Sequence, residues 1–389
     1  IVAGCDMDMM SYSYLRNIKN LIDDGELQVS VLDDAVRRVL KLKFRLGLFD
    51  EPYSRKVEKT AIYSSDVKDV ACALAEESTV LLKNDGLLPL GNDVRHIVVT
   101  GPMADAPYDQ LGTWSLDGDK SCTVTPLAAM REMLPENIRL DYIPVLDYPR
   151  DENVTDFKRL RKTAKNADVV IAFVGEEQMM SGEAHSLSSL HLQGRQTELL
   201  REIAESGTPL VTVVMAGRPL VMDEATSLSS SLLYMWHPGT MGGPAIVNLL
   251  WGRACPSAKL PVTFPRNEGQ IPMYYNHKHT SHIAKGTEGD LSRVPREKPQ
   301  SVMGHTSSYL DVPPTPQFPF GFGLTYTKFE IGSPQLESTE VNLDGILKVS
   351  VELGNVGKMQ GTEVLQFYVS KKSASVTRPI KELKGFVRV

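Results

Sequence analysis

Four short apolar runs constrain the fold of this chain more than any other feature. None alternates apolar with polar residues, and they are HIVVTG (96–101), DVVIAFVGE (168–176), LVTVVMAG (210–217) and SLLYMWH (231–237). Strands that are apolar throughout are buried on both faces, as in a parallel sheet covered by helices. Predicted helices at 66–84, 194–206 and 242–252 alternate with these runs. The sequence therefore predicts an α/β sandwich with a mostly parallel sheet over residues 86–265.

Residues 1–52 have a different pattern. Their first apolar stretch is interpreted as the end of a strand, and two amphipathic helices follow it. The first helix is expected to break at Gly25. The second is expected to begin at Ser30, as its N-cap, and to stop at Gly47. These elements are too few to bury a core, so they are predicted to dock on other structure, and residues 53–85 are predicted to be a linker and helix into the next domain.

The C-terminal part is predicted to contain two further regions. Residues 266–325 are rich in Pro, His, Ser and Gly and lack periodicity, which predicts a long surface loop. Residues 326–389 alternate apolar and polar residues around Gly and Asn turns, the pattern of antiparallel strands in a β-sandwich. The sandwich is expected to be incomplete at Val389. The start, IVAGCDMDMM, has no initiator Met, so the chain is expected to be a piece of a longer protein.

Composition limits the partners of the protein. The formal net charge of −6 and the lack of a dense Lys/Arg block predict no nucleic-acid partner, and the apolar runs are too short to predict a membrane span.

The four cysteines lack the spacing of metal ligands and are expected to be isolated thiols, with a disulfide as the alternative. The histidines of YYNHKHTSH (274–282) are interpreted as part of a polar loop rather than a metal site. No metal or organic cofactor is predicted.

A loop rich in acids follows the second apolar run. It carries Glu176, Glu177 and Glu183, together with His185 and His191. Ligands of α/β folds bind where strands end, and a loop acid can donate a proton if burial or a second carboxylate raises its pKa. The alternative interpretation is that the first two glutamates cap a helix or pair with basic residues, while the third is merely solvated.

Trp114 lies between glycine and acidic turn residues in GTWSLDGD (112–119). An exposed Trp in such a loop offers a flat apolar face to a sugar ring. The alternative is that its ring fills a gap at a domain interface.

Taken together, the motifs identify a family resemblance. The chain resembles family 3 glycoside hydrolases, in particular the bacterial three-domain β-glucosidases, over almost its whole length. The motifs that carry the resemblance occur in one order and include AGCDMDMMS, ALAEESTVLLKNDGLLPL, GPMADAPYDQLGTWS, VGEEQMMSGEAHS, WHPGTMGGPAI, FPFGFGLTYTKF and RPIKELKGF. Each motif is weak alone, whereas the ordered set is highly specific.

This resemblance implies a fold and a mechanism. The fold would be the end of an N-terminal (β/α)8-type barrel, then the α/β sandwich, then a fibronectin-III-like β-sandwich. Glu183, in the motif GEA, would be the general acid/base of a retaining hydrolysis, and Trp114 would flank the aglycone side of the sugar site. The nucleophile would be a second carboxylate about 5–5.5 Å away. The family places that aspartate on a barrel strand before Ile1, so Asp6 and Asp8 are interpreted as structural.

Two positions depart from the family pattern. Relatives often carry Arg and, two residues later, Asp after the acid/base, whereas this chain has Leu187 and Ser189. The change removes an expected ion pair and leaves the geometry of the loop open.

The predicted function is that of an exo-acting retaining β-glycosidase, foremost a β-glucosidase acting on short β-glucans or aryl glucosides. A β-xylosidase or dual glucosidase/xylosidase is the alternative within the class. A non-catalytic carbohydrate-binding subunit is the alternative outside it. The expected partners are an oligosaccharide or β-glucoside and the rest of the barrel, and a homo-oligomer is compatible with the sequence. The resemblance implies a periplasmic or secreted protein.

Overall fold

The computed structural model describes residues 1–53, 62–279, 291, 294–299, 309–342 and 344–389. These residues form two compact units, 1–64 and 65–389, and each is described by itself. The last three residues of YYNHKHTSH lie outside the described residues, as do parts of the predicted linker and long loop.

The first unit contains two helices, α1 (Ser13–Asp23) and α2 (Val29–Arg45). Gly25 and Gly47 have the positive φ of left-handed backbone and end the two helices, which confirms their predicted roles. The predicted N-cap was wrong: Ser30 lies inside α2, because Gln28 has the extended backbone of the cap position. The predicted strand before α1 is also wrong: residues 1–12 form turns and bends, and no strand among the described residues pairs with them.

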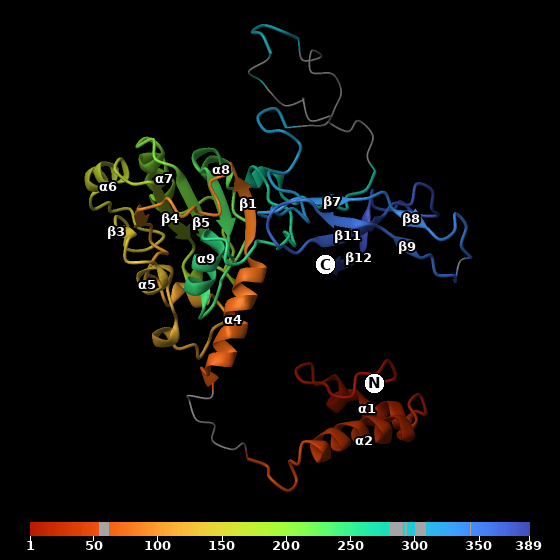
Figure 1. The fold of residues 1–389 in the computed structure, drawn as a ribbon. Helices are drawn as coiled ribbons and strands as arrows, with labels where there is room; N and C mark the ends of the chain where they lie inside the picture. The colour runs from red at the N-terminus through yellow and green to blue at the C-terminus, as the bar shows by residue number, and fades with distance from the viewer. Residues whose placement is uncertain (54–61, 280–290, 292–293, 300–308, 343) are drawn as a thin grey trace. The chain divides into compact units, whose positions relative to one another are not determined.

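The second unit is built around a six-stranded sheet (Figure 1). Its strands are β1 (Val80–Asn84), β2 (His96–Thr100), β3 (Arg139–Ile143), β4 (Val169–Gly175), β5 (Leu210–Met215) and β6 (Ser231–Tyr234), in the order β1-β6-β5-β4-β2-β3. All neighbours are parallel except β1, which is antiparallel to β6. The mostly parallel sheet is thereby confirmed, and its four central strands coincide with the four apolar runs.

In this second unit, one helix was predicted too long. The helix expected over 66–84 ends early, as α4 (Ser65–Ser78), and its last residues form strand β1 instead. Leu81 and Leu82 point into opposite hydrophobic clusters of the sheet, and both are buried. Pairing with β6 supplies this burial, which a continued helix would not.

Helices cover both faces of the sheet (Figure 1). They are α5 (Pro126–Met133), α6 (Phe157–Ala164), α7 (Gln196–Ala204), α8 (Asp223–Leu228) and α9 (Gly242–Leu250). Short 3-10 turns occur in the loops at Asp109–Leu111, Lys120–Cys122, Gln178–Met180 and Glu268–Gln270. One hydrophobic cluster contains buried residues of α6, α7 and α8, and the other contains buried residues of α5 and α9. Strand β4 is buried along its whole length and contributes alternate residues to both clusters. None of the described helices is long and apolar enough to cross a bilayer.

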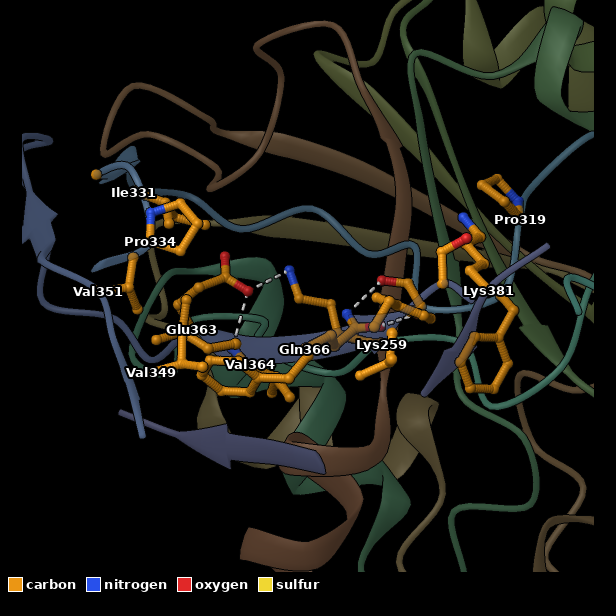
Figure 2. A pocket seen from close by; sticks show the side chains of 18 of the residues that line it. Lys259, Pro319, Ile331, Pro334, Val349, Val351, Glu363, Val364, Gln366 and Lys381 are labelled. Carbon is orange, nitrogen blue, oxygen red and sulfur yellow. Dashed lines mark hydrogen bonds and ion pairs between the residues drawn. The ribbon is translucent and has the colours of Figure 1, made fainter. Parts of the chain in front are cut away.

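The C-terminal strands pair as antiparallel ladders, as the alternating sequence predicted. They are β7 (Phe329–Ile331), β8 (Gln335–Leu336), β9 (Val349–Ser350), β10 (Leu353–Asn355), β11 (Val364–Val369) and β12 (Glu382–Arg388), and the pairs are β10–β7, β8–β9 and β11–β12. A mostly apolar cavity of about 990 Å³ lies among these strands (Figure 2). Its polar lining includes Lys259 and Glu363, whose side chains form an ion pair of 2.8 Å.

Candidate active site

The topology of the sheet selects one crevice. From β2 the chain moves outward to β3, but it then returns to β4 on the other side of β2 and continues to β5 and β6. The loops after β2 and β4 therefore leave the sheet at a topological switch point, where open α/β sheets bind ligands. The loop after β2 carries Trp114, and the loop after β4 carries Glu183.

Reciprocal hydrogen bonds join these two loops. The Thr113 hydroxyl donates to the carbonyls of Gln178 and Ser181 at 2.7 and 3.0 Å. In return, the Gln178 amide donates to the Gly112 carbonyl at 2.7 Å and to the Ser115 hydroxyl at 2.6 Å. Because each loop holds the backbone of the other, the residues beside Trp114 and the residues before Glu183 form one connected unit.

Glu183 lies on a tight turn of this unit. Gly182 has φ of +105°, and a Cβ there would lie 2.2 Å from the methyl group of Thr113, so only glycine fits. Ala184, on the other side, has φ of 61°, which costs a non-glycine residue about 1 kcal/mol or more. Two left-handed residues thus flank an exposed carboxyl group, and strain of this kind is concentrated at functional sites.

The other two glutamates of the loop are buried and paired with arginines. Glu176 lies 3.0 Å from the Arg218 guanidinium, and Glu177 accepts two hydrogen bonds from Arg150 at 2.7 and 2.9 Å. Burial raises the pKa of Glu176 above its ordinary value, although the charge of Arg218 opposes the increase. These pairs confirm the interpretation that the first two glutamates have structural partners. Glu183 differs, because no described side chain or backbone group hydrogen-bonds to it.

The site also contains a half-buried carboxyl group, that of Asp109, which the sequence did not single out. Asp109 accepts a hydrogen bond from the backbone N–H of Gln178 at 3.0 Å. Burial raises the pKa of Asp109, and the nearby Glu177 carboxylate adds to the increase. Asp109 therefore adds another acid to the base of the two joined loops.

A Ser–His contact lies beneath the Glu183 turn. The Ser181 hydroxyl is 3.3 Å from Nε2 of His237, and Nδ1 of the same ring has no hydrogen-bond partner among the described residues. Gly217 allows this approach, since a Cβ there would lie 2.2 Å from the Ser181 hydroxyl. Burial lowers the pKa of His237 to about 4. The imidazole is therefore neutral at pH 7 and acts as a hydrogen-bonding group in the floor of the site.

Trp114 is 66% exposed, so its ring is not covered within the described chain. This exposure leaves the indole face available to a ligand or to another part of the protein. Both interpretations of Trp114 remain predictions.

Other residues predicted from sequence have clear positions. Asp6 forms a two-point ion pair with Arg38 at 2.7 and 2.8 Å, and Asp8 accepts from the amide of Tyr14 at the start of α1, which supports their structural interpretation. His185 is exposed and follows Glu183 by two residues. His191 has a different partner, because its Nε2 lies 3.1 Å from a carboxylate oxygen of Glu268.

Three further features of the sequence can be compared with the structure. The four cysteines are free thiols. No cluster of His, Cys, Asp or Glu with metal-binding geometry occurs among the described residues. Leu187, at the position where relatives often have Arg, is half-buried, as is Ser189.

Two cavities can be compared as sites. A small polar cavity of about 370 Å³ lies against the Glu183 turn and is lined by residues 181–182, 185–187 and 217–218. Among the described residues that line the larger cavity of Figure 2, Glu363 is the one carboxylate, and Lys259 forms an ion pair with it. Acid/base chemistry needs a carboxyl group free to exchange a proton, so the turn after β4 is the better candidate.

Several of these residues were missed by reasoning from sequence. Thr113, Gln178 and His237 lie inside motifs of the family resemblance, but no motif assigned a role to them or to Arg218. Their place in the candidate site follows only from contacts between loops that are distant in the sequence. A further signal was their position in the loops that follow β2, β4, β5 and β6.

Comparison with known proteins shows which family the chain matches. Residues 79–326 match the glycosyl hydrolase family 3 C-terminal domain, and residues 363–389 match a fibronectin type III-like domain. The chain is 36% identical to a periplasmic β-glucosidase of Salmonella typhimurium and 33% identical to a β-xylosidase of Formosa agariphila. Both alignments cover 100% of this chain. They cover 52% of the length of the Salmonella typhimurium protein and 53% of the length of the Formosa agariphila protein.

A solved structure is similar along the whole chain. The β-glucosidase of Listeria innocua, crystallised in complexes that include gluconolactone and glucose, superposes with a TM-score of 0.83 at 35% identity. The alignment covers 100% of this chain and 51% of that one. The chain thus spans about half the length of the relatives it matches. With its mostly parallel sheet and its C-terminal antiparallel strands, it belongs to glycosyl hydrolase family 3.

Proposed function

We propose that the protein is an exo-acting retaining β-glycosidase, and more narrowly a β-glucosidase that removes terminal glucose from short β-glucans or aryl glucosides. The observation that carries the proposal is the exposed carboxyl group of Glu183, held on a strained turn at the switch point of the sheet. The Salmonella typhimurium and Listeria innocua relatives are both β-glucosidases, which supports the narrower proposal.

In this proposal Glu183 acts twice. It first protonates the glycosidic oxygen as the bond to the sugar breaks, and it then takes a proton from the water that hydrolyses the glycosyl-enzyme. The glycosyl-enzyme forms on a second carboxylate, which the family resemblance assigns to an aspartate before Ile1. Neither step uses a metal or organic cofactor.

A second candidate function is supported by one observation. The Formosa agariphila relative, 33% identical, is a β-xylosidase, so a xylosidase or dual activity is the alternative. We expect the intact protein to hydrolyse 4-nitrophenyl β-D-glucoside with a higher kcat/KM than the matching β-D-xyloside. The reverse ratio would assign a xylosidase. Binding of sugar with no turnover of either substrate would favour a carbohydrate-binding subunit.

The location of the protein relative to the cell is also part of the proposal. We infer a periplasmic or secreted protein, because the relative from Salmonella typhimurium is periplasmic.

We further propose that Trp114 stacks on the sugar or aglycone beside the scissile bond. Trp114→Ala should remove about 1–3 kcal/mol of apolar contact, seen mainly as a higher KM. The loss should be larger on a cello-oligosaccharide than on a small aryl glucoside, because only the longer ligand fills the outer subsite. The measurement is kcat and KM on both substrates, together with the melting temperature.

A matched control is Tyr108→Ala, which removes another exposed ring from the same loop. If Trp114→Ala lowers the melting temperature strongly and affects all substrates equally, the ring fills an interface and does not bind sugar.

A further inference from the structure

The turn that carries Glu183 is tied to the fold at very few points. Among the described residues, the only side chain that donates a hydrogen bond to the backbone between Gly182 and Ser189 is that of Arg218. Inside the turn, the amide of His185 donates to the Gly182 carbonyl at 3.2 Å. The position of the Glu183 carboxyl group therefore depends on how firmly Arg218 is held.

Arg218 is anchored on its inner side. Its guanidinium faces Glu176, whose side chain is 2% exposed, with 3.0 Å between the nearest nitrogen and oxygen. Oε2 of Glu176 also accepts from the Gly217 amide at 3.3 Å. The carbonyl of Arg218 accepts from the hydroxyl of Tyr234, a fully buried residue of β6. Main chain and side chain are thus both fixed by groups at the ends of β4 and β6.

On its outer side the same guanidinium holds the loop. One terminal nitrogen, Nη2, donates to the carbonyl of Met180 and, at 3.1 Å, to the carbonyl of His185. These carbonyls lie on either side of Glu183 in the sequence. A planar guanidinium can use Nε toward Glu176 and Nη2 toward the loop at once, whereas the single ammonium of lysine cannot reproduce this fork.

We propose that Arg218 is a positioning residue for the acid/base. Its guanidinium is held by the buried Glu176 at the end of β4, and it fixes the backbone of the turn that carries Glu183. This inference rests on the proposed function for its catalytic consequence, but the mechanical part stands on the contacts alone. Misplacement of a catalytic group by about 1 Å can cost about 100-fold in rate, so a loose turn matters.

The mechanical part is tested by hydrogen exchange on the folded protein. We expect Arg218→Lys to speed amide exchange in residues 182–189 at least about tenfold, with exchange in β4 and β5 unchanged. Because lysine pairs less well with the buried Glu176, a second variant, Glu176→Gln with Arg218→Met, removes both charges together and leaves no unpaired buried charge. Amide exchange in residues 182–189 of this double variant is compared with exchange in the single variant Glu176→Gln, so that the difference reports the loss of Arg218. The control is Arg201→Lys, which changes an exposed arginine paired with Glu224.

Unchanged exchange in residues 182–189 of both Arg218 variants, with the fold intact, would overturn the proposal. An equal increase in exchange over the whole sheet would also overturn it, because Arg218 would then be a general stabiliser.

The catalytic part is tested by kinetics on the intact protein. Arg218→Lys should lower kcat/KM on cellobiose roughly 10- to 100-fold and have a smaller effect on 2,4-dinitrophenyl glucoside, which needs little acid assistance. In a Glu183→Ala background the same change should cost little more, because Arg218 acts through Glu183. If Glu183→Ala is selective for leaving groups and Arg218→Lys is not, the positioning role is wrong. If Glu183→Ala is not selective, the proposed function fails, and the exchange experiment alone decides whether Arg218 holds the turn.

Discussion

Replacing Glu183 with alanine should lower kcat/KM of the intact protein by roughly 100- to 10,000-fold on substrates with poor leaving groups, the range that general acid–base catalysis contributes. A glycosidic oxygen of high basicity must be protonated as the bond breaks, and the variant has no carboxyl group to do so. A dinitrophenolate leaves without a proton, so its release should be affected much less. The measurement is kcat/KM across aryl glucosides of graded leaving-group pKa, with cellobiose as the demanding case.

Chemical rescue gives this prediction a second readout. In the alanine variant water is no longer activated, so the glycosyl-enzyme should accumulate on activated substrates. Azide ion needs no general base, and its attack on the glycosyl-enzyme should restore turnover and form β-glucosyl azide with retained configuration. The control is Glu152→Ala, which removes another exposed loop glutamate. An equal loss on all substrates without azide rescue would contradict the role of Glu183 and direct attention to Glu176, Glu177 or Asp109.

The second large effect is expected from His237, as a dependence of stability on pH. Its pKa is about 4 in the folded protein because of burial, against an ordinary value of 6.5. Above pH 6.5 the ring is neutral in both states and contributes no pH dependence. As the pH falls from 6.5 to 4, the unfolded chain takes up a proton that the folded ring does not. The free energy of unfolding should then fall by about 1.4 kcal/mol per pH unit, or about 3 kcal/mol in all.

The test compares chemical unfolding at pH 7 and pH 4 for the protein and for His237→Asn. The variant should be less sensitive to acid by about 3 kcal/mol, because its amide does not titrate. His185→Asn, which alters an exposed ring near Glu183, is the control for loss of a histidine from this region. Equal acid sensitivity of His237→Asn and the unchanged protein would show that the ring is protonated without cost in the folded state.

His237 also illustrates why parts of the site escaped the sequence. Nothing in MWHPG distinguishes a buried imidazole from an exposed one, because its burial depends on Gly112 and Gly217, which come from two other loops. The partners of the loop glutamates are a similar case. Glu176 pairs with a residue 42 positions away and Glu177 with one 27 positions away, so these pairs exist only once the strands are in register.

The sequence by itself determined the central strands, the glycine ends of the first two helices and the strand-end position of the Glu183 loop. These follow from short-range physics: an unbroken apolar run must be buried on both faces, and left-handed backbone favours glycine. The tertiary structure decided what residues 80–84 become, since their apolar side chains suit a helix or a strand until β6 offers an edge to pair with. It also decided that Glu183 alone of the three glutamates stays exposed, because arginines brought in by folding pair with the other two. Such contacts cross the sheet, and their energy depends on distances that no local pattern encodes.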